Sequence, residues 1–214
     1  MLHTETLTNS TLELIKKLMR DAVFDKFVLV GGTSLSLQLG YRISVDIDLF
    51  SNETFNENEL LEYLRINYSF ELDFLDKETL KGEIDGVKID CIAHKYPWLN
   101  AALREEDIRL AGFEDIAAMK LNAIVGNGTR VKDFIDLAYL SGKISLNTML
   151  SSYQKKYQSN PILALKAIIY FEDINFNEPI KMTDKKRYNW KNIKKQIEQM
   201  ISLPDTIFED NEKR

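Results

Sequence analysis

The chain has 214 residues, of which 44% are hydrophobic and 29% charged, a composition typical of one large globular domain or two small ones. Its formal net charge of −5 excludes a basic field over the whole protein that would attract nucleic acid. A single cysteine and two histidines exclude a disulfide framework and a zinc centre. The first residues lack the regions of a signal peptide, and no apolar stretch reaches membrane-spanning length. We therefore expect a cytoplasmic protein without a membrane partner.

The first half of the chain alternates short apolar runs with amphipathic segments, which predicts strands and helices in mixed order. Gly31 stops the first apolar run, Gly40 marks a helix end, and Asn56 opens a capping-box-like sequence. Asp85 and Gly86 form a strong hairpin signal. The predicted elements are helices over residues 9–22, 33–39 and 56–67, and strands over residues 27–30, 44–50, 70–75, 79–84 and 87–93.

The character of the sequence changes after Pro97, and amphipathic segments predominate from there on. The predicted helices of this half cover residues 114–125, 131–140, 147–157, 161–171 and 190–201. The predicted fold class is therefore α+β. We expect residues 1–97 to form a core of sheet and helices, and residues 98–214 to form a helical region that completes the active-site cleft.

Asp46 and Asp48 are the most informative residues of the chain. Within an extended strand, residues i and i+2 point to the same face, so both carboxylates leave one side while Val45, Ile47 and Leu49 anchor the other. Two carboxylates this close repel each other unless a cation holds them, and hard oxygen ligands suit Mg²⁺ bound together with substrate phosphates. The alternative interpretation is a surface strand that presents two acids to water.

A glycine pair precedes these aspartates in the sequence. Gly31 and Gly32 lie where a strand turns into a helix, and without a Cβ they let backbone N–H groups approach an anion. Thr33 and Ser34 add hydroxyl donors. By itself the pair indicates no more than a tight turn, but together with an Asp-x-Asp strand it predicts a clamp for a nucleotide triphosphate.

A third acid is expected on a neighbouring strand if two metal ions activate an in-line displacement. Asp90 fits this expectation because it is an acid within a β-branched strand, on the face of Lys88 and Ile92. A position on an edge strand is the alternative explanation. His94 shares this face, and we interpret it as structural.

A second polar group lies on the predicted helices of the second half. Lys120 interrupts an apolar helix, and Arg130 and Lys132 begin the next helix, where they are candidates for compensating phosphate charge. Asp133 and Asp136 are three residues apart and share a face of that helix. The alternative is a solvated helix start, where acids are favoured.

Cations alternate with aromatic residues over positions 185–191, a composition that suits contact with an RNA backbone and base stacking. The wider segment, residues 181–195, carries seven basic side chains against the single acid Asp184. We favour the ordinary interpretation, a basic loop that leads into a helix whose Trp190 packs in the core.

These motifs together resemble those of the AbiEii/AbiGii nucleotidyltransferase toxins. The resemblance rests on residues 30–35, on the run from Arg42 to Phe50 with its Ser-x-Asp-x-Asp pattern, on Lys120 and on residues 130–137. That family consists of the toxin halves of bacterial type IV toxin–antitoxin, or abortive-infection, pairs within the DNA polymerase β-like nucleotidyltransferase superfamily. The glycine pair and the Asp-x-Asp element are also similar to those of tRNA CCA-adding enzymes.

The resemblance implies a polymerase β-like mixed sheet with flanking helices, NTP as substrate, and Mg²⁺ or Mn²⁺ as cofactor. Asp46 and Asp48 would bind the metal, and Asp90 is a further ligand or base inferred from its strand position. The remaining implied roles are phosphate binding by Gly31, Gly32, Thr33, Ser34 and Ser44, triphosphate contact by Lys120, Arg130 and Lys132, and a fourth-motif role for Asp133 or Asp136.

The implied reaction transfers a nucleoside monophosphate from an NTP to an acceptor hydroxyl, on a tRNA 3′ end or a protein, and releases pyrophosphate. An antitoxin encoded nearby is the implied partner. Two alternatives remain open. One is a non-catalytic nucleotide- or RNA-binding module of the same fold, and the other is a nucleotidyltransferase that modifies a small molecule such as an antibiotic.

Overall fold

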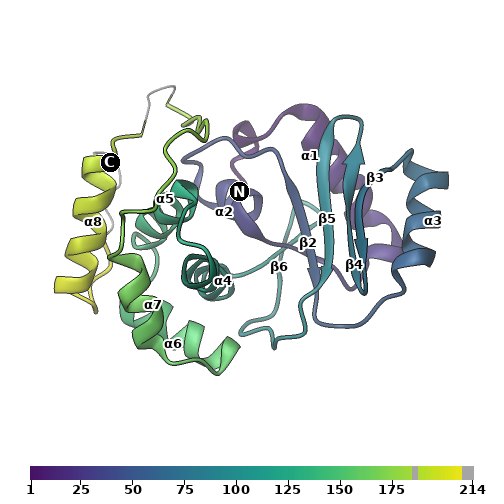
Figure 1. Ribbon diagram of the computed structural model, residues 1–214. Coiled ribbons are helices and arrows are strands. Elements are labelled where there is room, and N and C mark those ends of the chain that lie inside the picture. Colours follow the sequence, from purple (N-terminus) through teal and green to yellow (C-terminus); the bar gives the residue numbers. More distant parts are fainter. Residues whose placement is uncertain (185–187, 209–214) are drawn as a thin grey trace. The chain divides into compact units, whose positions relative to one another are not determined.

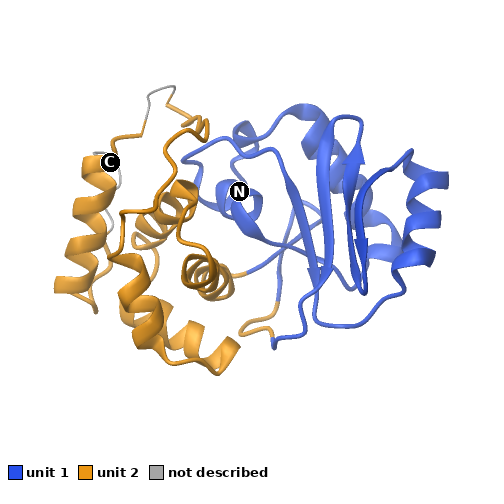
Figure 2. Cartoon of the chain, in the orientation of Figure 1, with its two compact units in different colours: residues 1–97, 102–111 blue, residues 98–101, 112–214 orange. Residues whose placement is uncertain are grey.

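The computed structural model describes residues 1–184 and 188–208, and the chain divides into two compact units (Figure 2). The first unit holds residues 1–97 and 102–111, and the second holds residues 98–101 and those from 112 onward. The first combines a sheet with helices and the second is mainly helical, so the predicted α+β class is confirmed. In the described part of the chain, no helix is long and apolar enough to cross a membrane.

Within the described residues, the first unit contains a mixed seven-stranded sheet in the order β3-β4-β5-β2-β1-β7-β6 (Figure 1). The strands are β1 Val28–Leu29, β2 Ile47–Ser51, β3 Glu71–Asp76, β4 Thr79–Ile84, β5 Val87–Ala93, β6 Leu103–Glu105 and β7 Ile108–Leu110. β2 is parallel to β5 and β1 is parallel to β7, whereas the other neighbours are antiparallel. The β2–β5 pairing brings the two strands that carry predicted acids side by side.

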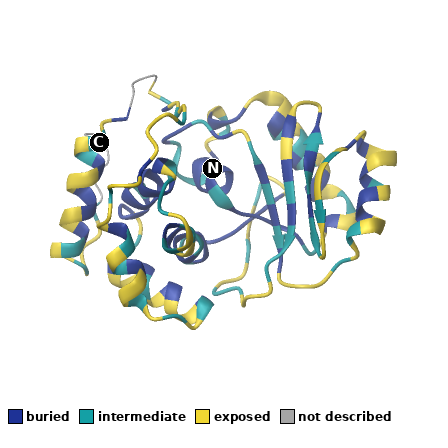
Figure 3. Cartoon of the chain, in the orientation of Figure 1, coloured by how far each residue is buried: buried dark blue, intermediate teal, exposed yellow. Residues whose placement is uncertain are grey.

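The helices of the first unit pack around a core that lies on the sheet. They are α1 Asn9–Arg20, α2 Gly31–Leu39 and α3 Glu57–Tyr68, with short 3₁₀ turns at Thr4–Thr6 and Ala22–Phe24. Ile15 of α1 and Leu64 of α3 belong to the same buried cluster as Ile47 and Leu49 of β2. The alternate residues of β2 and β5 are only half-buried or exposed (Figure 3). The polar face of these strands is therefore the one available for chemistry.

The predicted hairpin between β4 and β5 is confirmed. Its turn residues, Asp85 and Gly86, have φ of 50° and 80°, in the left-handed region that two-residue hairpin turns require. Because the turn fixes the register of β5, Asp90 lies opposite Lys81 of β4 and beside Asp48 of β2.

A second hairpin, formed by β6 and β7, has no signal in the sequence. It turns at Glu106 and Asp107, whose φ angles of 49° and 65° are uncommon for residues other than glycine. We predicted a helical region from residue 98, but these two strands join the sheet of the first unit beside β1. The buried Arg109 fixes β7 by donating hydrogen bonds to the backbone oxygens of Met19 at 2.8 Å and Phe27 at 3.0 Å.

The second unit is a bundle around α4. Its helices are α4 Phe113–Gly126, α5 Val131–Leu140, α6 Leu146–Tyr157, α7 Pro161–Ile168 and α8 Trp190–Ser202. α4 contacts α5, α6 and α7, and α8 packs on α5 (Figure 1). Each predicted helix is present, although α7 ends at Ile168 rather than at residue 171.

Candidate active site

The glycine pair opens a helix, as predicted, but α2 begins at Gly31 rather than at residue 33. Gly31 has φ of +67°, which glycine adopts freely and residues with a Cβ seldom adopt. A Cβ on Gly31 would collide with the carboxylate of Asp48, and a Cβ on Gly32 would collide with the guanidinium of Arg42. Position 31 favours glycine because its φ is positive and the Asp48 carboxylate lies against it, whereas a Cβ at Gly32 would require the end of the Arg42 side chain to move.

Asp48 is a predicted metal ligand that the structure places beside the glycine pair. It lies on the half-buried face of β2, and its backbone oxygen accepts a hydrogen bond from the N–H of Val30 at 2.9 Å. That bond ties β2 to the residue before α2, so the Asp48 carboxylate lies over the first turn of the helix. Helix amides that favour an anion and a carboxylate that favours a cation are thus adjacent.

Asp46 lies one residue before β2, which begins at Ile47 rather than at Ser44 as predicted. The backbone oxygen of Asp46 accepts a hydrogen bond from the Thr33 hydroxyl. Val45 is 54% exposed, so the prediction that it anchors the opposite face is wrong. The physical reason is that this segment is not yet part of the strand, and the hydroxyl of α2 positions it instead of strand alternation.

The hydroxyl groups predicted to contact phosphate are buried and have protein partners. Thr33 Oγ1 is 2.8 Å from Ser44 Oγ, and Ser34 Oγ accepts a hydrogen bond from Gln38 Nε2 at 3.2 Å. These groups hold α2 against the segment before β2. The N-cap residue of α2, Val30, supplies no side-chain hydrogen bond, so the backbone amides of the first turn are the candidate anion-binding groups of the motif.

Asp90 lies beside Asp48 in the parallel β2–β5 pairing, the position expected of a third acid. Its carboxylate forms an ion pair with Lys81, its neighbour on β4. Among residues 1–184 and 188–208, no three histidine, cysteine or acidic side chains are grouped closely enough to hold a metal ion. Mg²⁺ and Mn²⁺ are commonly bound by one or two carboxylates together with substrate phosphates and water, and Asp46 and Asp48 stay the predicted carboxylates for that arrangement.

In the second unit, Lys120 lies between the two aspartates of α5. Its Nζ is 2.7 Å from Asp133 Oδ1 and 2.6 Å from Asp136 Oδ2, and all three side chains are buried. Because buried charges require partners, this triad holds α4 against α5. The triphosphate contact predicted for Lys120 would require its ammonium to exchange a carboxylate for a phosphate.

The two basic residues at the start of α5 differ in their surroundings. Arg130 is half-exposed, and its Nε is 3.9 Å from Asp133 Oδ2, a buried oxygen without a hydrogen bond from any described residue. Lys132 forms an ion pair with Glu178 at 2.7 Å. Arg130 therefore places a positive charge beside the Asp133 carboxylate of the triad.

Arg42 is a residue of the site that sequence reasoning did not single out. Its side chain is 5% exposed, its guanidinium lies against Gly32, and its Nη1 donates a hydrogen bond to the backbone oxygen of Ile43 at 3.2 Å. The sequence feature that could have identified Arg42 as a site residue was its position at the start of the motif that ends at Phe50. A lone arginine in a sequence usually indicates a surface residue, so this signal was weak.

The second unit contains another buried ion pair that the sequence did not reveal. Lys156 Nζ is 2.7 Å from Asp115 Oδ1 and 4.7 Å from the ring centre of Trp98. Asp115 also accepts hydrogen bonds from the backbone N–H groups of Leu99 and Asn100. Acids are common in the first turn of a helix because the helix dipole favours them there, so the sequence did not indicate that Asp115 pairs with Lys156.

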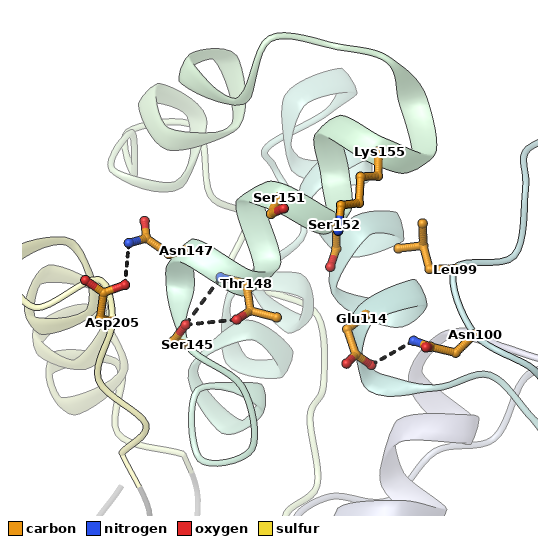
Figure 4. Close-up of a pocket in the computed structure, with 10 residues that line it drawn as sticks. All are labelled: Leu99, Asn100, Glu114, Ser145, Asn147, Thr148, Ser151, Ser152, Lys155 and Asp205. Atoms are coloured by element: carbon orange, nitrogen blue, oxygen red, sulfur yellow. Dashed lines mark hydrogen bonds between the residues drawn. The ribbon is translucent and has the colours of Figure 1, made fainter.

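A polar pocket of about 470 Å³ lies in the second unit (Figure 4). Hydrogen bonds join several of its side chains in pairs: Asn147 donates to Asp205 at 2.6 Å, and Asn100 donates to Glu114 at 3.1 Å. The residues that line it are Leu99, Asn100, Glu114, Ser145, Asn147, Thr148, Ser151, Ser152, Lys155 and Asp205. None of the side chains predicted to bind metal or nucleotide is among them.

The basic and aromatic run is only partly described, because residues 185–187 lie outside the described residues. The ring of Trp190 makes edge contacts with Phe134 at 6.2 Å, Phe171 at 5.6 Å and Phe176 at 5.2 Å between ring centres. Trp190 therefore packs against aromatic rings of the second unit, but it is only half-buried, so it lies at the edge of the core and not within it as predicted.

Two comparisons of the sequence with known proteins found matches. The family model described as nucleotidyl transferase AbiEii toxin, type IV TA system, matches residues 13–99, which include the glycine pair and all three predicted metal ligands. An uncharacterized protein of Aquifex aeolicus (strain VF5), aq_aa25, is 31% identical over 172 residues, which are 75% of this chain and 81% of that protein.

Two solved structures share the fold. A putative nucleotidyltransferase from H. pylori has a TM-score of 0.55 at 18% identity, with 92% of this chain and 96% of that chain covered. JHP933 from Helicobacter pylori has a TM-score of 0.50 at 18% identity, with 93% of each chain covered. On the family model and the sequence relative, this chain belongs to the AbiEii family of nucleotidyltransferases.

Proposed function

We propose that this nucleotidyltransferase moves a nucleoside monophosphate from an NTP to an acceptor hydroxyl in a metal-dependent reaction. The observation that carries the proposal is the Asp48 carboxylate lying against Gly31 at the start of α2, with Asp46 two residues upstream. This arrangement offers amides for an anion and carboxylates for a cation at one place. A nucleotide triphosphate with its divalent ion has both charges.

The first proposed step is binding of the triphosphate at the first turn of α2. Gly31 and Gly32 let the phosphate oxygens approach the backbone N–H groups, and the helix dipole favours their negative charge. Arg42, whose guanidinium lies against Gly32, adds a fixed positive charge beneath this turn. Thr33 and Ser44 act indirectly, because their hydroxyls hold the segment that carries Asp46.

The second proposed step is in-line displacement at the α-phosphorus. The acceptor oxygen forms a bond to this phosphorus, the bond to the bridging oxygen of the β-phosphate breaks, and pyrophosphate leaves. Asp46 and Asp48 would hold a Mg²⁺ or Mn²⁺ ion, which when bound neutralises phosphate charge and lowers the pKa of the attacking hydroxyl. Asp90, on the neighbouring strand, is the proposed recipient of the proton after its ion pair with Lys81 opens.

For the second unit, we propose two kinds of role. Arg130 and Lys132 are candidates for phosphate contact, and Arg130 is the more exposed of the two. Lys120 and Asp136 belong to a buried triad with Asp133, which supports a positioning role for them. Direct contact of Lys120 with the triphosphate stays a prediction, since it competes with two short ion pairs.

The biological role we propose is that of a toxin in a type IV toxin–antitoxin or abortive-infection pair. The support is the family, whose description names both the toxin and the type IV system. The proposed acceptor is a tRNA 3′ end or a protein hydroxyl, and the proposed partner is an antitoxin encoded nearby.

The test is transfer of label from each α-³²P-NTP to total cellular RNA or protein. We expect the double variant Asp46→Asn with Asp48→Asn to abolish transfer, because it removes both proposed metal ligands without changing side-chain size. The matched control is Asp73→Asn with Asp76→Asn, which removes two exposed carboxylates from the edge strand β3. Circular dichroism checks that both variants are folded.

Undiminished transfer by the Asp46 and Asp48 variant would refute the assignment of these residues. NTP binding without labelled product on RNA, protein or small-molecule acceptors would favour a non-catalytic binding module. Labelled product on an antibiotic alone would instead identify a small-molecule nucleotidyltransferase.

A further inference from the structure

The polar pocket of the second unit is a cavity that the proposed reaction does not use (Figure 4). All of its lining residues belong to the second unit, and its volume of about 470 Å³ lies within the range of small-molecule sites, about 300–1,000 Å³. Two hydrogen-bonded pairs, Asn147 with Asp205 and Asn100 with Glu114, lie at opposite sides of it, and polar residues of α6 lie between them.

Ser152 differs from the other lining residues because it is buried while its hydroxyl has no protein partner. It is 5% exposed, and its hydroxyl forms no hydrogen bond with any residue that the structure describes. Ser145, which is similarly buried, accepts a hydrogen bond from the N–H of Thr148 at 3.3 Å. Figure 4 shows the Ser152 hydroxyl on the side of α6 that faces Glu114. Because a buried hydroxyl without a partner costs free energy, this group calls for a hydrogen bond from a molecule in the pocket.

A buried ion pair and backbone hydrogen bonds hold the walls of the pocket in place. Asp115 accepts hydrogen bonds from the N–H groups of Leu99 at 3.1 Å and Asn100 at 3.2 Å, and from Lys156 Nζ at 2.7 Å. These contacts join the segment before residue 101, the start of α4 and the end of α6, each of which lines the pocket. The walls are therefore preformed, and binding does not have to order them.

The lining residues disfavour two classes of ligand. Leu99 supplies the apolar contact among them, so a mainly hydrophobic molecule would leave the polar walls without partners. Glu114 and Asp205 place two negative charges on the lining against the positive charge of Lys155. A phosphate would therefore meet net repulsion in the pocket.

The start of α6 does not reverse this preference, because its amides from Asn147 onward have protein partners. The N–H of Asn147 donates to the backbone oxygen of Pro204 at 2.9 Å. Ser145 accepts from the other two, through its hydroxyl from Thr148 at 3.3 Å and through its backbone oxygen from Met149 at 3.0 Å. The pocket is therefore not built as a second phosphate site.

The polar groups that remain match hydroxyl groups, each of which both donates and accepts a hydrogen bond. Asn100 uses one N–H of its amide for Glu114 Oε2, and Asn147 uses one for Asp205 Oδ1. Each pair keeps a second amide N–H as a donor and a second carboxylate oxygen as an acceptor. The Ser152 hydroxyl, between the pairs, can do both.

We propose that this pocket binds a polyhydroxylated small molecule of the sugar type that carries no negative charge. Ser152 bonds one ligand hydroxyl, and the two amide–carboxylate pairs bond others. The excess negative charge of the lining also accepts an ammonium group, so an amino sugar binds at least as well as a neutral sugar. The inference goes beyond the proposed function and does not depend on it, because no side chain proposed to bind metal or nucleotide lines the pocket.

Binding is measured by saturation-transfer difference NMR on the full-length protein, with glucose, glucosamine and glucose 6-phosphate as probes that share one ring. Glucose and glucosamine are expected to bind at millimolar concentration. Glucose 6-phosphate is expected to bind at least about tenfold more weakly than glucose, because its phosphate meets Glu114 and Asp205. No saturation transfer from glucose and glucosamine would overturn the proposal, and tighter binding of the phosphate ester would overturn the ligand class.

Two variants locate the binding site. Ser152→Ala is expected to weaken binding of both sugars about fivefold, because it removes one hydrogen bond. Glu114→Gln keeps the size of the side chain and is expected to weaken glucosamine about tenfold and glucose less, because it removes a negative charge. The matched control is Glu62→Gln, at an exposed position of α3 in the first unit. Circular dichroism checks that each variant is folded, and unchanged sugar binding in Ser152→Ala and Glu114→Gln would overturn the assignment to this pocket.

The variant Asp46→Asn with Asp48→Asn separates this inference from the proposed function. It is expected to abolish label transfer and to bind glucosamine as the wild type does. Loss of glucosamine binding in this variant would place the sugar in the first unit and overturn the assignment to the pocket. Undiminished label transfer would refute the proposed function, whereas the sugar-binding measurements would still decide whether the pocket holds a sugar.

Discussion

The two units use charged residues in different ways. In the first unit, Asp48 and Asp90 lie on a half-buried sheet face, and Asp48 lies against a helix start that favours anions. In the second unit, Lys120 and Lys156 are buried and bound to aspartates at 2.6–2.7 Å. A ligand can reach charges on a half-buried face, including the partly exposed Asp90–Lys81 ion pair, whereas ion pairs buried inside a bundle specify packing.

This difference explains why motif residues of the two units support unlike roles. The motifs of the first unit place backbone amides and carboxylates around a position that a ligand can take. The motif residues Lys120, Asp133 and Asp136 form buried ion pairs with one another, so their first effect is on how α4 packs on α5. We therefore expect substitutions of these buried residues in the second unit to lower mainly stability, and substitutions at the glycine pair and carboxylates of the first unit to lower mainly activity.

The largest effect on stability is expected from Lys156→Met. This change leaves Asp115 buried without its cation, and breaking a buried pair costs about 3–5 kcal/mol in the free energy of unfolding. The matched control is Arg20→Met, since the side chains of Arg20 and Asp107 are both more than half exposed in their ion pair and an exposed pair contributes less than about 1 kcal/mol. Urea denaturation measures both values. Equal losses in the two variants would contradict the division of roles.

The largest effect on activity alone is expected from Gly31→Ala. The new Cβ would meet the Asp48 carboxylate, and φ of +67° adds backbone strain of about 1–2 kcal/mol. We expect kcat/KM to fall at least about a hundredfold, because the new Cβ would push the carboxylate away from the helix amides and a small misplacement of a reacting group costs much of the rate. Label-transfer kinetics measure this loss.

Gly126→Ala provides the control for that experiment. A Cβ at Gly126 meets no heavy atom within 4 Å, and this glycine ends the helix α4. Alanine should stabilise the protein by up to about 1 kcal/mol there and leave transfer unchanged. Activity in Gly31→Ala close to that of Gly126→Ala would contradict the proposed site.

A smaller effect on activity is expected from Arg42→Lys. Lysine keeps the positive charge but loses the planar guanidinium that lies against Gly32. We expect the KM for NTP to rise about tenfold with little change in kcat, since the proposed role concerns phosphate binding. Arg65→Lys, at an exposed position of α3, is the control and should leave both constants unchanged. A drop confined to kcat would argue for a different role of Arg42.

Much of the fold followed from local signals. The Asp85 and Gly86 turn, the glycine that ends α2 and the cap of α3 at Asn56 act within a few residues, so the sequence pattern predicts the elements that they bound. We expected a third acid on a strand next to the one that carries Asp48, and the pairing of β2 with β5 does bring Asp90 beside Asp48.

The features that escaped prediction depend on residues far apart in the sequence. β6 and β7 turn at Glu106 and Asp107 without glycine, and Arg109 holds β7 through backbone oxygens more than eighty positions earlier. Likewise, Lys120 was predicted to contact phosphate, and the sequence gives no sign that α5 supplies its two partners. Partner choice is decided by tertiary packing, which periodicity does not encode.

The smallest effect is expected from Asp21, a first-unit carboxylate that is stabilised by hydroxyl groups. Partial burial raises the pKa of Asp21, but hydrogen bonds from Tyr68 at 2.6 Å and Tyr63 at 2.8 Å outweigh it and hold that pKa below its ordinary value. A carboxyl whose pKa is lower in the folded state contributes stability at neutral pH, and this contribution is lost as the pH falls through the folded-state pKa.

Asp21→Asn should therefore lower the free energy of unfolding at pH 7 and make little difference once the pH is below the lowered folded-state pKa of Asp21, where the wild-type carboxyl is protonated in both states. Urea denaturation at several pH values measures this convergence. Asp73→Asn, at an exposed position of β3, is the control and should run parallel to wild type at each pH. A constant gap between Asp21→Asn and wild type would mean that Asp21 acts through packing, as the buried acids of the second unit do, and the contrast between the units would lose one of its supports.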